Sequence, residues 1–374
     1  MNKKKYERIL LSHGGGGKET SELIGGIIFD GLYGQDVGNG YFYGSHNGDG
    51  ISADISNQKI NLLEDAAVLK SPQKIAFTTD GFTVSPVFFK GGDIGKLSVA
   101  GTVNDLSVMG AKPLFLSLGL IIEEGFALED LRKIIKSISD EASKTGVRVA
   151  TGDTKVVPLG KADGIFINTS GIGEILYDEL SVYNIASGDI IIVSGNVGDH
   201  GAAVMSQREG IEMDVEIESD CASLWGMINA VLSRGIKVNA IRDATRGGLA
   251  AVLNEWAMAA GIDIYAEEDK IPVSGPVKGF CELLGFEPYQ LACEGRAVFA
   301  VKPEFADKTL GILRSHPLGK NADIIGKAVA RTGTKSSDGG GGRKNSSGKV
   351  ILKGIYGVDR ILDYPSGELL PRIC

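Results

Sequence analysis

Apolar positions follow two spacings along the chain, and these predict alternating strands and helices. The segment 128–146 repeats apolar residues at helical spacing, with acids early and Lys144 late, as a helix dipole favours. The segment 92–111 has similar spacing and closes at Gly110. Further helices are predicted at about 199–209, 222–234 and 247–261, and strands at about 75–85, 113–122, 147–153, 165–176, 189–194, 296–301 and 349–355. The pattern predicts an α/β chain.

The length of 374 residues predicts two domains, because a single core rarely extends over so long a chain. We expect a flexible Gly-rich segment at 1–45, a first domain at 46–165, a second α/β domain at 166–355 and a mobile tail at 356–374. Residues 331–348 contain too few apolar residues to order themselves, and predict a flexible loop.

Charge and cysteine content exclude several classes of protein. A net charge of −8 disfavours binding to nucleic acid or an acidic membrane, since both need a basic face. A cytoplasmic location is expected, because no long apolar run or apolar signal core is present. The four cysteines form no CxxC pair, so zinc and redox dithiols are disfavoured, and Cys221, Cys281 and Cys293 are expected to be buried.

Acidic and amide side chains stand where predicted strands and helices meet small residues. They are Asp65, Asp80, Asn104, Asp105 and Asp153. Oxygen ligands without histidine or thiolate suit Mg²⁺ bound together with substrate phosphates. Each residue taken alone is more often a turn or helix-capping residue, so the interpretation depends on the set.

Two glycine-rich segments have the character of anion sites. SHGGGGKET (12–20) presents backbone N–H groups and Lys18, but Ser12 and Glu19 exclude a Walker A loop, which leaves a lid over a triphosphate or a plain spacer. DATRGGLA places two glycines before a helix, with Asp243 and Thr245 as possible caps. The alternative is an ordinary loop between a strand and a helix.

Glu294 in ACEGR and Lys155 in TGDTK are candidates for proton transfer or for orienting a phosphate, if the two segments converge. Their spacing does not establish convergence, and both residues also fit a solvated surface.

The last residue, Cys374, is the sharpest feature. A terminal thiol has no packing role, and its freedom allows it to move between sites, while Pro371 favours a short extended approach. The alternative is a chance cysteine on a frayed end. A prenylation box is excluded, because it requires cysteine four residues from the end.

These motifs together resemble the HypE family of hydrogenase-maturation carbamoyl dehydratases. The resemblance runs from LSHGGGGK through EDAAVL, TTDGFTVSPVFFKGGDIGKLSVAGTVNDLSVMGA, TGDTKVV, DATRGGLA and LACEGR to the final LPRIC, and so covers nearly the whole chain. Gly15 and Lys18 depart from the HGSGGR expected of the family, and the loop 331–348 is longer than usual.

The resemblance implies a two-domain aminoimidazole ribonucleotide synthetase-like fold with mixed sheets. The N-terminal domains, which bind ATP, pair across a homodimer into a β-barrel, and ATP and Mg²⁺ are the cofactors. The implied nucleotide-binding residues are Lys18, Asp65, Asp80, Asn104, Asp105, Asp153, Thr154 and Asp243, and the implied metal ligands are Asp65, Asp80, Asp105 and Asp153.

The implied substrate is the tail itself. A HypF-like carbamoyltransferase places a carboxamide on the Cys374 sulfur, and ATP-dependent dehydration then gives a thiocyanate. A HypC–HypD-like iron complex receives the cyanide ligand for a NiFe-hydrogenase. Glu294 and Lys155 are the candidates for deprotonating and orienting the amide nitrogen, and the sequence does not decide between them. Because the tail must move between sites, a poorly ordered terminus is expected.

Other activities remain alternatives. A small-molecule ATP-dependent synthetase of the same superfamily would not need Cys374. A selenophosphate synthetase would carry a cysteine or selenocysteine near Lys18, and the first cysteine here is Cys221. A carrier without catalysis would keep Cys374 but would not need the acidic set.

Overall fold

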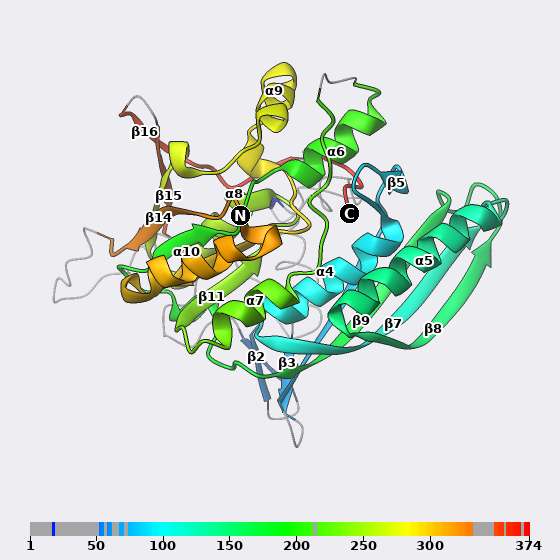
Figure 1. Ribbon diagram of the computed structural model, residues 1–374, viewed down its shortest axis with the longest axis horizontal. Helices are drawn as coiled ribbons and strands as arrows, with labels where there is room; N and C mark the ends of the chain where they lie inside the picture. Colours follow the sequence, from blue (N-terminus) through cyan, green and yellow to red (C-terminus); the bar gives the residue numbers. More distant parts are fainter. Residues whose placement is uncertain are drawn as a thin grey trace, which may run out of the picture.

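The computed structural model describes residues 17–18, 52–55, 58–61, 67–70, 74–211, 215–331, 348–354, 357–367 and 370–374. They form two α/β domains side by side (Figure 1). Most of the segment 1–45, Asp65 and nearly all of the loop 331–348 lie outside the described residues. In the part of the chain that is described, every helix is too short or too polar to cross a bilayer.

The first domain is built on a five-stranded mixed sheet, and the helices α4 and α5 cover one face of it (Figure 1). Only β7 and β8 run parallel. In sheet order its strands are β3 (Ala67–Lys70), β4 (Lys74–Phe82), β9 (Ile165–Ile175), β7 (Ala111–Glu123) and β8 (Arg148–Val157), and its helices are α4 (Ile94–Val108) and α5 (Leu128–Thr145). Two small hairpins are formed by β1 (Ser52–Ile55) with β2 (Gln58–Asn61), and by β5 (Phe88–Phe89) with β6 (Gly92–Asp93).

Helix α4 is the central helix of the molecule. The Asp93 carboxylate caps it, accepting hydrogen bonds from the backbone N–H groups of Gly95 (2.7 Å) and Lys96 (3.0 Å). Nearly every residue of α4 is buried, because the helix packs against its own sheet and also against helix α7 (Trp225–Leu232) of the second domain. The helix therefore connects the two domains.

The second domain has a seven-stranded mixed sheet that is buried on both faces. Helix α8 packs with Val193 and Val298 on one side, and α7 and α10 pack with Ile192 and Phe299 on the other. Burial of both faces explains the unbroken apolar runs of its central strands. In sheet order the strands are β11 (Val238–Asp243), β13 (Ala297–Val301), β10 (Ile190–Val193), β14 (Asp323–Val329), β12 (Asp263–Glu267), β15 (Val350–Lys353) and β16 (Asp359–Ile361). The helices are α6 (Asp199–Arg208), α7, α8 (Gly248–Ala260), α9 (Gly275–Leu284) and α10 (Ala306–Ser315).

The predicted elements are all present within a few residues of their predicted ends, and the three cysteines expected to be buried are buried. The pattern missed the short strands β1, β2, β3, β5 and β6, and also β11, β12, β14, β16, α9 and α10. Strand β9 pairs with β7 along its whole length and with β4 from Ile167 to Glu174, so the first sheet continues to Ile175, past the predicted boundary at 165/166.

Candidate active site

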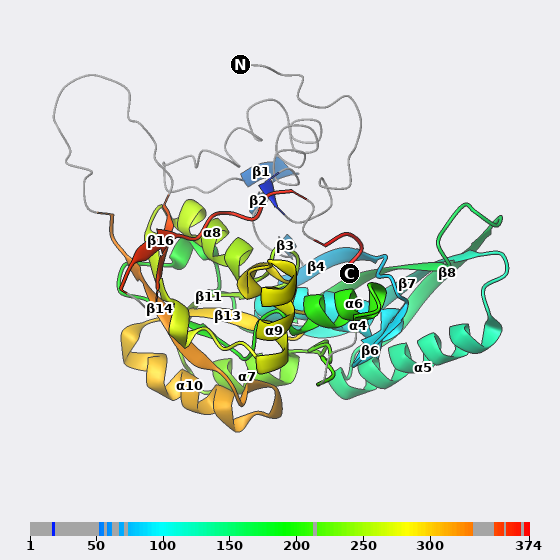
Figure 2. The same cartoon turned by 90° about the horizontal axis from the view of Figure 1, so that it is seen from above.

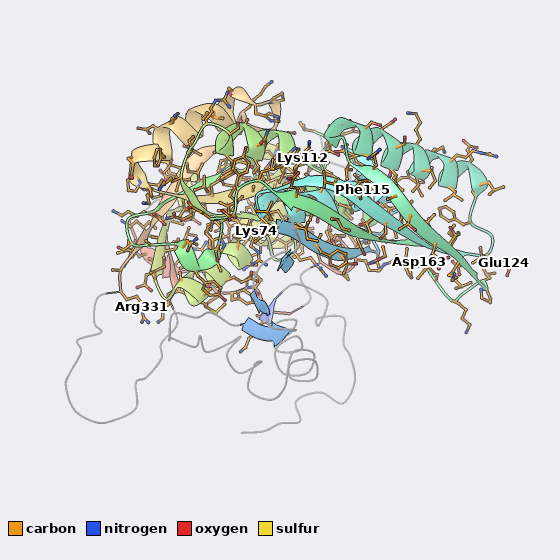
Figure 3. The ribbon with its side chains drawn as sticks, turned by 90° about the horizontal axis from the view of Figure 1, so that it is seen from below. Lys74, Lys112, Phe115, Glu124, Asp163 and Arg331 are labelled. Atoms are coloured by element: carbon orange, nitrogen blue, oxygen red, sulfur yellow. The ribbon has the colours of Figure 1, made fainter. Side chains whose placement is uncertain are left out.

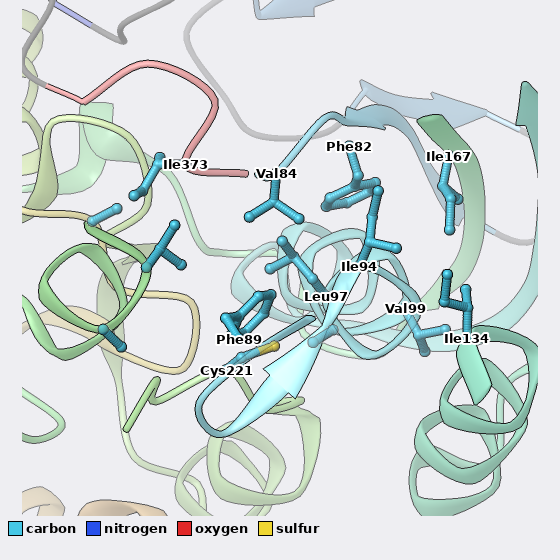
Figure 4. Close-up of a cluster of buried hydrophobic side chains, with 14 of the residues drawn as sticks. Phe82, Val84, Phe89, Ile94, Leu97, Val99, Ile134, Ile167, Cys221 and Ile373 are labelled. Carbon is cyan, nitrogen blue, oxygen red and sulfur yellow. The ribbon is translucent and has the colours of Figure 1, made fainter. Parts of the chain in front are cut away.

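The last five residues of the chain are docked at the junction of the two domains. The main-chain oxygen of Cys374 accepts hydrogen bonds from the Thr83 backbone N–H (3.0 Å) and the Thr83 hydroxyl (3.1 Å). The Ser85 N–H donates to the Arg372 carbonyl (3.2 Å), so the tail pairs antiparallel to the segment that continues β4. Ile373 is buried in the core cluster that also contains Val84 (Figure 4). This pairing brings Cys374 close to the acid on β4.

Four charged side chains act on the half-buried Cys374 thiol. Burial is the main cause that raises the pKa of this thiol to about 12, and the carboxylates of Glu294, Asp80 and Asp243 raise it further. The positive charge of Arg246 opposes them. The docked thiol is therefore protonated near pH 7.

Asp80 and Asp105 meet where β4 packs on α4. Burial raises the pKa of Asp80, and its Oδ1 accepts a hydrogen bond from the Gly81 N–H (2.8 Å). Asp105 on α4 accepts a hydrogen bond from the Thr78 hydroxyl (2.8 Å) on the same strand. Gly101 permits this close approach, because a Cβ there would lie 2.9 Å from the Phe82 ring. The packing of β4 on α4 thus brings two of the predicted acids together.

Asp243 and Glu294 contribute two further buried carboxyls from the second domain. Asp243 ends β11, and burial raises its pKa to about 6. Glu294 is 2% exposed, and burial followed by the charges of Asp243 and Asp80 raises its pKa well above the usual value. Its Oε1 has no hydrogen-bond partner among the described residues. A buried carboxyl with a raised pKa and an unpartnered oxygen is a candidate for proton transfer.

Hydrogen bonds and a close approach of its backbone hold the loop that carries Glu294 in place. The Glu294 N–H donates to Asp220 Oδ1 (3.0 Å). Gly295 follows, and a Cβ at that position would lie 1.8 Å from the Asp220 carbonyl oxygen. The Asn104 amide donates to the carbonyls of Ala222 (3.1 Å) and Glu294 (3.3 Å), and accepts from the Leu224 N–H (2.8 Å). Asn104 therefore joins α4 to the loops around Glu294.

Arg246 is a site residue that the sequence reading did not select. The pKa of Arg246 is raised. The largest cause is its electrostatic interaction with Cys374, and Asp80, Glu294 and Asp105 add to the effect. The available signal was its place in DATRGGLA, directly before a helix N-terminus. The expected capping by Asp243 and Thr245 is wrong: Gly247, at φ +78, is the N-cap of α8, and no side chain caps the helix.

The predicted residues on β8 (Asp153, Thr154 and Lys155) lie apart from this cluster within one chain. Asp153 and Lys155 form an exposed ion pair (2.5 Å) on β8, and the Thr154 N–H donates to Asp153 (2.8 Å). Asp153 pairs with Gly119, which pairs through β9 with Gly81, so three strand spacings, about 14 Å, separate it from β4. The Lys18 backbone N–H donates to Pro365 (2.9 Å), beside the tail. Asp65 lies outside the described residues.

The donor set of the cluster suits a hard cation. Asp80, Asp105, Asp243 and Glu294 offer only oxygen, and the unpartnered Glu294 Oε1 has spare acceptor capacity. Within the described ranges no group of three or more His, Cys, Asp or Glu side chains is placed to hold a metal ion by itself. The set therefore fits Mg²⁺ that keeps several ligands from substrate phosphates or water.

Comparisons with known proteins point to one family. The model for the N-terminal domain of AIR synthase related proteins matches residues 63–175, and the model for their C-terminal domain matches residues 186–339. A carbamoyl dehydratase HypE of Rhizobium leguminosarum bv. viciae is 42% identical over 371 residues, which cover 98% of this chain and 95% of that protein.

Two solved structures extend the comparison. A crystal structure of a HypE–HypF complex matches with a TM-score of 0.77 and 42% identity, over 92% of this chain and 99% of that chain. A hydrogenase maturation protein HypE in complex with ATP matches with a TM-score of 0.75 and 36% identity, over 98% of this chain and all (100%) of that chain.

Proposed function

The chain belongs to the HypE carbamoyl dehydratases of the AIR synthase-related family, and we propose that Cys374 carries the group on which this activity operates. As a HypE the chain is an ATP-dependent carbamoyl dehydratase of hydrogenase maturation. The observation that carries the proposal is the docked tail, whose thiol lies among Glu294, Asp80, Asp243 and Arg246.

Loading of the sulfur takes place with the tail undocked. The docked thiol has a pKa of about 12 and is a poor nucleophile near pH 7, because the thiolate is the reactive form. A HypF-like carbamoyltransferase meets the released tail and forms the S–C bond of the carboxamide. The HypE–HypF complex among the similar structures supports this choice of partner.

Dehydration takes place with the loaded tail docked. The carboxamide oxygen attacks the γ-phosphoryl group of ATP, and one N–H proton leaves. The second N–H proton then leaves as the C–O bond to phosphate breaks, which produces S–C≡N, ADP and phosphate. Phosphorylation is needed because phosphate is a far better leaving group than an amide oxygen.

The described side chains divide the tasks of this step. Glu294 is the base that takes an N–H proton, since its carboxyl is buried, has a raised pKa and lies near Cys374. Arg246 stabilises negative charge that builds on the transferred phosphoryl group. Asp80 and Asp105 would hold Mg²⁺, which would supply further positive charge at the phosphates when bound.

A homodimer is part of the proposal. The first sheet exposes apolar side chains on the face away from α4 and α5: Phe77, Ile172 and Phe115 lie in one cross-strand row, and Phe115 is labelled in Figure 3. Pairing of two such faces into a β-barrel would cover them. Asp153 and Lys155 share this open face by their register, so they would act on the partner copy.

The loaded tail must leave the site again to deliver cyanide to a HypC–HypD-like iron complex. A cytoplasmic location belongs to the same proposal.

Intact mass of the C-terminal peptide tests the function. The chain is incubated with ATP, Mg²⁺, carbamoyl phosphate and the HypF-like partner, with Cys374→Ala as control. A carboxamide adduct that loses the mass of water only when ATP is present supports the proposal. ATP consumption with unmodified Cys374 would instead favour a small-molecule synthetase of the same superfamily.

A further inference from the structure

The docked tail is held by its main chain and by two of its side chains, because Arg372 Nε donates to the Thr83 carbonyl (2.8 Å) and the Ile373 side chain is buried in the core. The main-chain contacts are the regular part of this docking. The carbonyl of Pro371 accepts a hydrogen bond from Arg208 Nη1 (2.6 Å), and the carbonyl of Arg372 accepts from Arg208 Nη2 (2.8 Å) and the Ser85 N–H (3.2 Å). The carbonyl of Ile373 accepts from His200 Nε2 (2.7 Å). Together with the Thr83 contacts to a main-chain oxygen of Cys374, each residue from 371 to 374 has a main-chain oxygen with a hydrogen-bond partner.

Helix α6 supplies both side chains of this clamp. His200 lies in its first turn and Arg208 is its last residue. Arg208 Nε also donates to the Ser85 carbonyl (2.8 Å), so one guanidinium bridges the tail and the segment after β4. Figure 2 shows α6 beside the C-terminus.

The His200 ring is fixed in one orientation. A carbonyl only accepts, so Nε2 carries the proton that is donated to Ile373, and Nδ1 of the neutral ring accepts from the Ser219 hydroxyl (2.7 Å). The Cys221 N–H donates to the Ser219 hydroxyl oxygen (3.0 Å), and the Phe89 ring lies perpendicular to the His200 ring, with 5.2 Å between the ring centroids. Burial lowers the pKa of His200, which keeps the ring neutral. The donor is therefore pre-oriented for the tail.

We propose that Arg208 and His200 are positioning residues that hold the loaded C-terminal segment in the site, by its peptide carbonyls, during ATP-dependent dehydration. The inference rests on the proposed function. The contacts of Arg208 and His200 with the tail are to main-chain carbonyls and not to the sulfur, so they act by setting the fraction of molecules with a docked tail. Loading by the carbamoyltransferase uses the undocked tail and does not need them.

Single-turnover dehydration tests the role of Arg208. The carboxamide is first loaded onto Cys374, ATP is then added, and intact mass follows the loss of water. Arg208→Ala removes charge-assisted hydrogen bonds and should slow dehydration by roughly tenfold to a hundredfold. Arg208→Lys should lose an intermediate factor, since one ammonium cannot bridge three carbonyls.

A second measurement reports docking without the reaction. Alkylation of Cys374 in the unloaded protein, located by peptide mass, should become faster in Arg208→Ala, while the rate of carboxamide loading stays equal to or above that of the wild type. Cys221, Cys281 and Cys293 are buried and serve as internal references. Arg314→Ala is the matched control, because Arg314 also lies in the last turn of a helix and donates Nε to a carbonyl, that of Ala322 (2.8 Å), far from the tail.

The outcomes separate the two proposals. If Arg208→Ala dehydrates and is alkylated at wild-type rates, the clamp is refuted while the function stands. Slow dehydration with unchanged alkylation also refutes the clamp, because the tail then stays docked. If the loaded wild type never loses water with ATP, the proposed function fails, and the alkylation rates still decide whether Arg208 docks the tail.

Discussion

Replacing Glu294 by glutamine should separate the activity of the site from the stability of the fold. Glu294→Gln keeps the size of a buried side chain but removes its capacity to accept a proton. Loss of a general base typically lowers a rate by about 10²–10⁴-fold, and we expect a fall of this size in single-turnover dehydration. Loading of Cys374 should not change, because it takes place with the tail undocked.

The same substitution should raise stability at neutral pH. Glu294 is buried near Asp243, Asp80 and Asp220, and its pKa in the folded protein lies well above the unfolded value. A carboxyl whose pKa is raised by folding leaves the fold unaffected below the unfolded pKa of about 4.3 and destabilises it as pH rises above that value, by about 1.4 kcal/mol for each unit of the raise. Glutamine has no such penalty.

Thermal unfolding followed from pH 4.5 to pH 8 measures this effect. The melting temperature of Glu294→Gln should increasingly exceed that of the wild type as pH rises, with exposed Glu304→Gln as the control that leaves the difference at zero. Equal dehydration rates in Glu294→Gln and wild type would refute the role of Glu294 as base. A variant less stable than wild type at pH 8 would refute the electrostatic argument.

Three further predictions concern the surroundings of the site. Arg246→Ala should lower the rate of dehydration by about 10²–10³-fold, because a pre-oriented charge next to the transferred group is lost. It should leave the rate of carboxamide loading unchanged, and mass spectrometry of both steps measures this. Gly295→Ala should destabilise the fold by about 1–3 kcal/mol in urea unfolding, since its Cβ would lie 1.8 Å from the Asp220 carbonyl oxygen, whereas Gly311→Ala, with open space around it, should not. Phe115→Glu should place a charge on the open sheet face and convert a dimer into a monomer in analytical ultracentrifugation; an unchanged mass would exclude that face as the interface.

Local patterns allowed acids of the site to be predicted, because the end of an apolar spacing marks the end of a strand or helix and these acids stand at such ends. Asp80 and Asp243 both terminate or nearly terminate strands, and packing of the two domains brings them together with Glu294. Asp153 looks equivalent in sequence, yet strand order places it three strands from β4. Sheet order depends on pairing between distant segments, which apolar spacing does not encode.

The residues missed by the sequence reading act only in the assembled fold. From the sequence alone, Arg246 and Arg208 cannot be distinguished from ordinary surface cations, and His200 cannot be distinguished from an ordinary buried histidine. Their roles depend on the place where the tail docks, and residue spacing along the chain carries no record of that place. The elements that were missed, such as β12 and β14, are short strands whose burial depends on neighbours across the sheet.

The point at which the tail leaves the folded body sets how far it can travel. Pro365 is buried and its carbonyl accepts a hydrogen bond from the Lys18 N–H (2.9 Å), and the Tyr364 hydroxyl donates to Glu255 (2.8 Å), so motion begins beyond Pro365. The remaining 9 residues, 366–374, can extend at most about 30 Å, which is about the diameter of a small domain. Under the proposed function, Cys374 would work as a swinging arm that carries a reactive group between neighbouring protein sites without releasing it into solution. Its short tether would keep the local concentration of the thiol at its own site in the millimolar range, about what a short flexible linker gives.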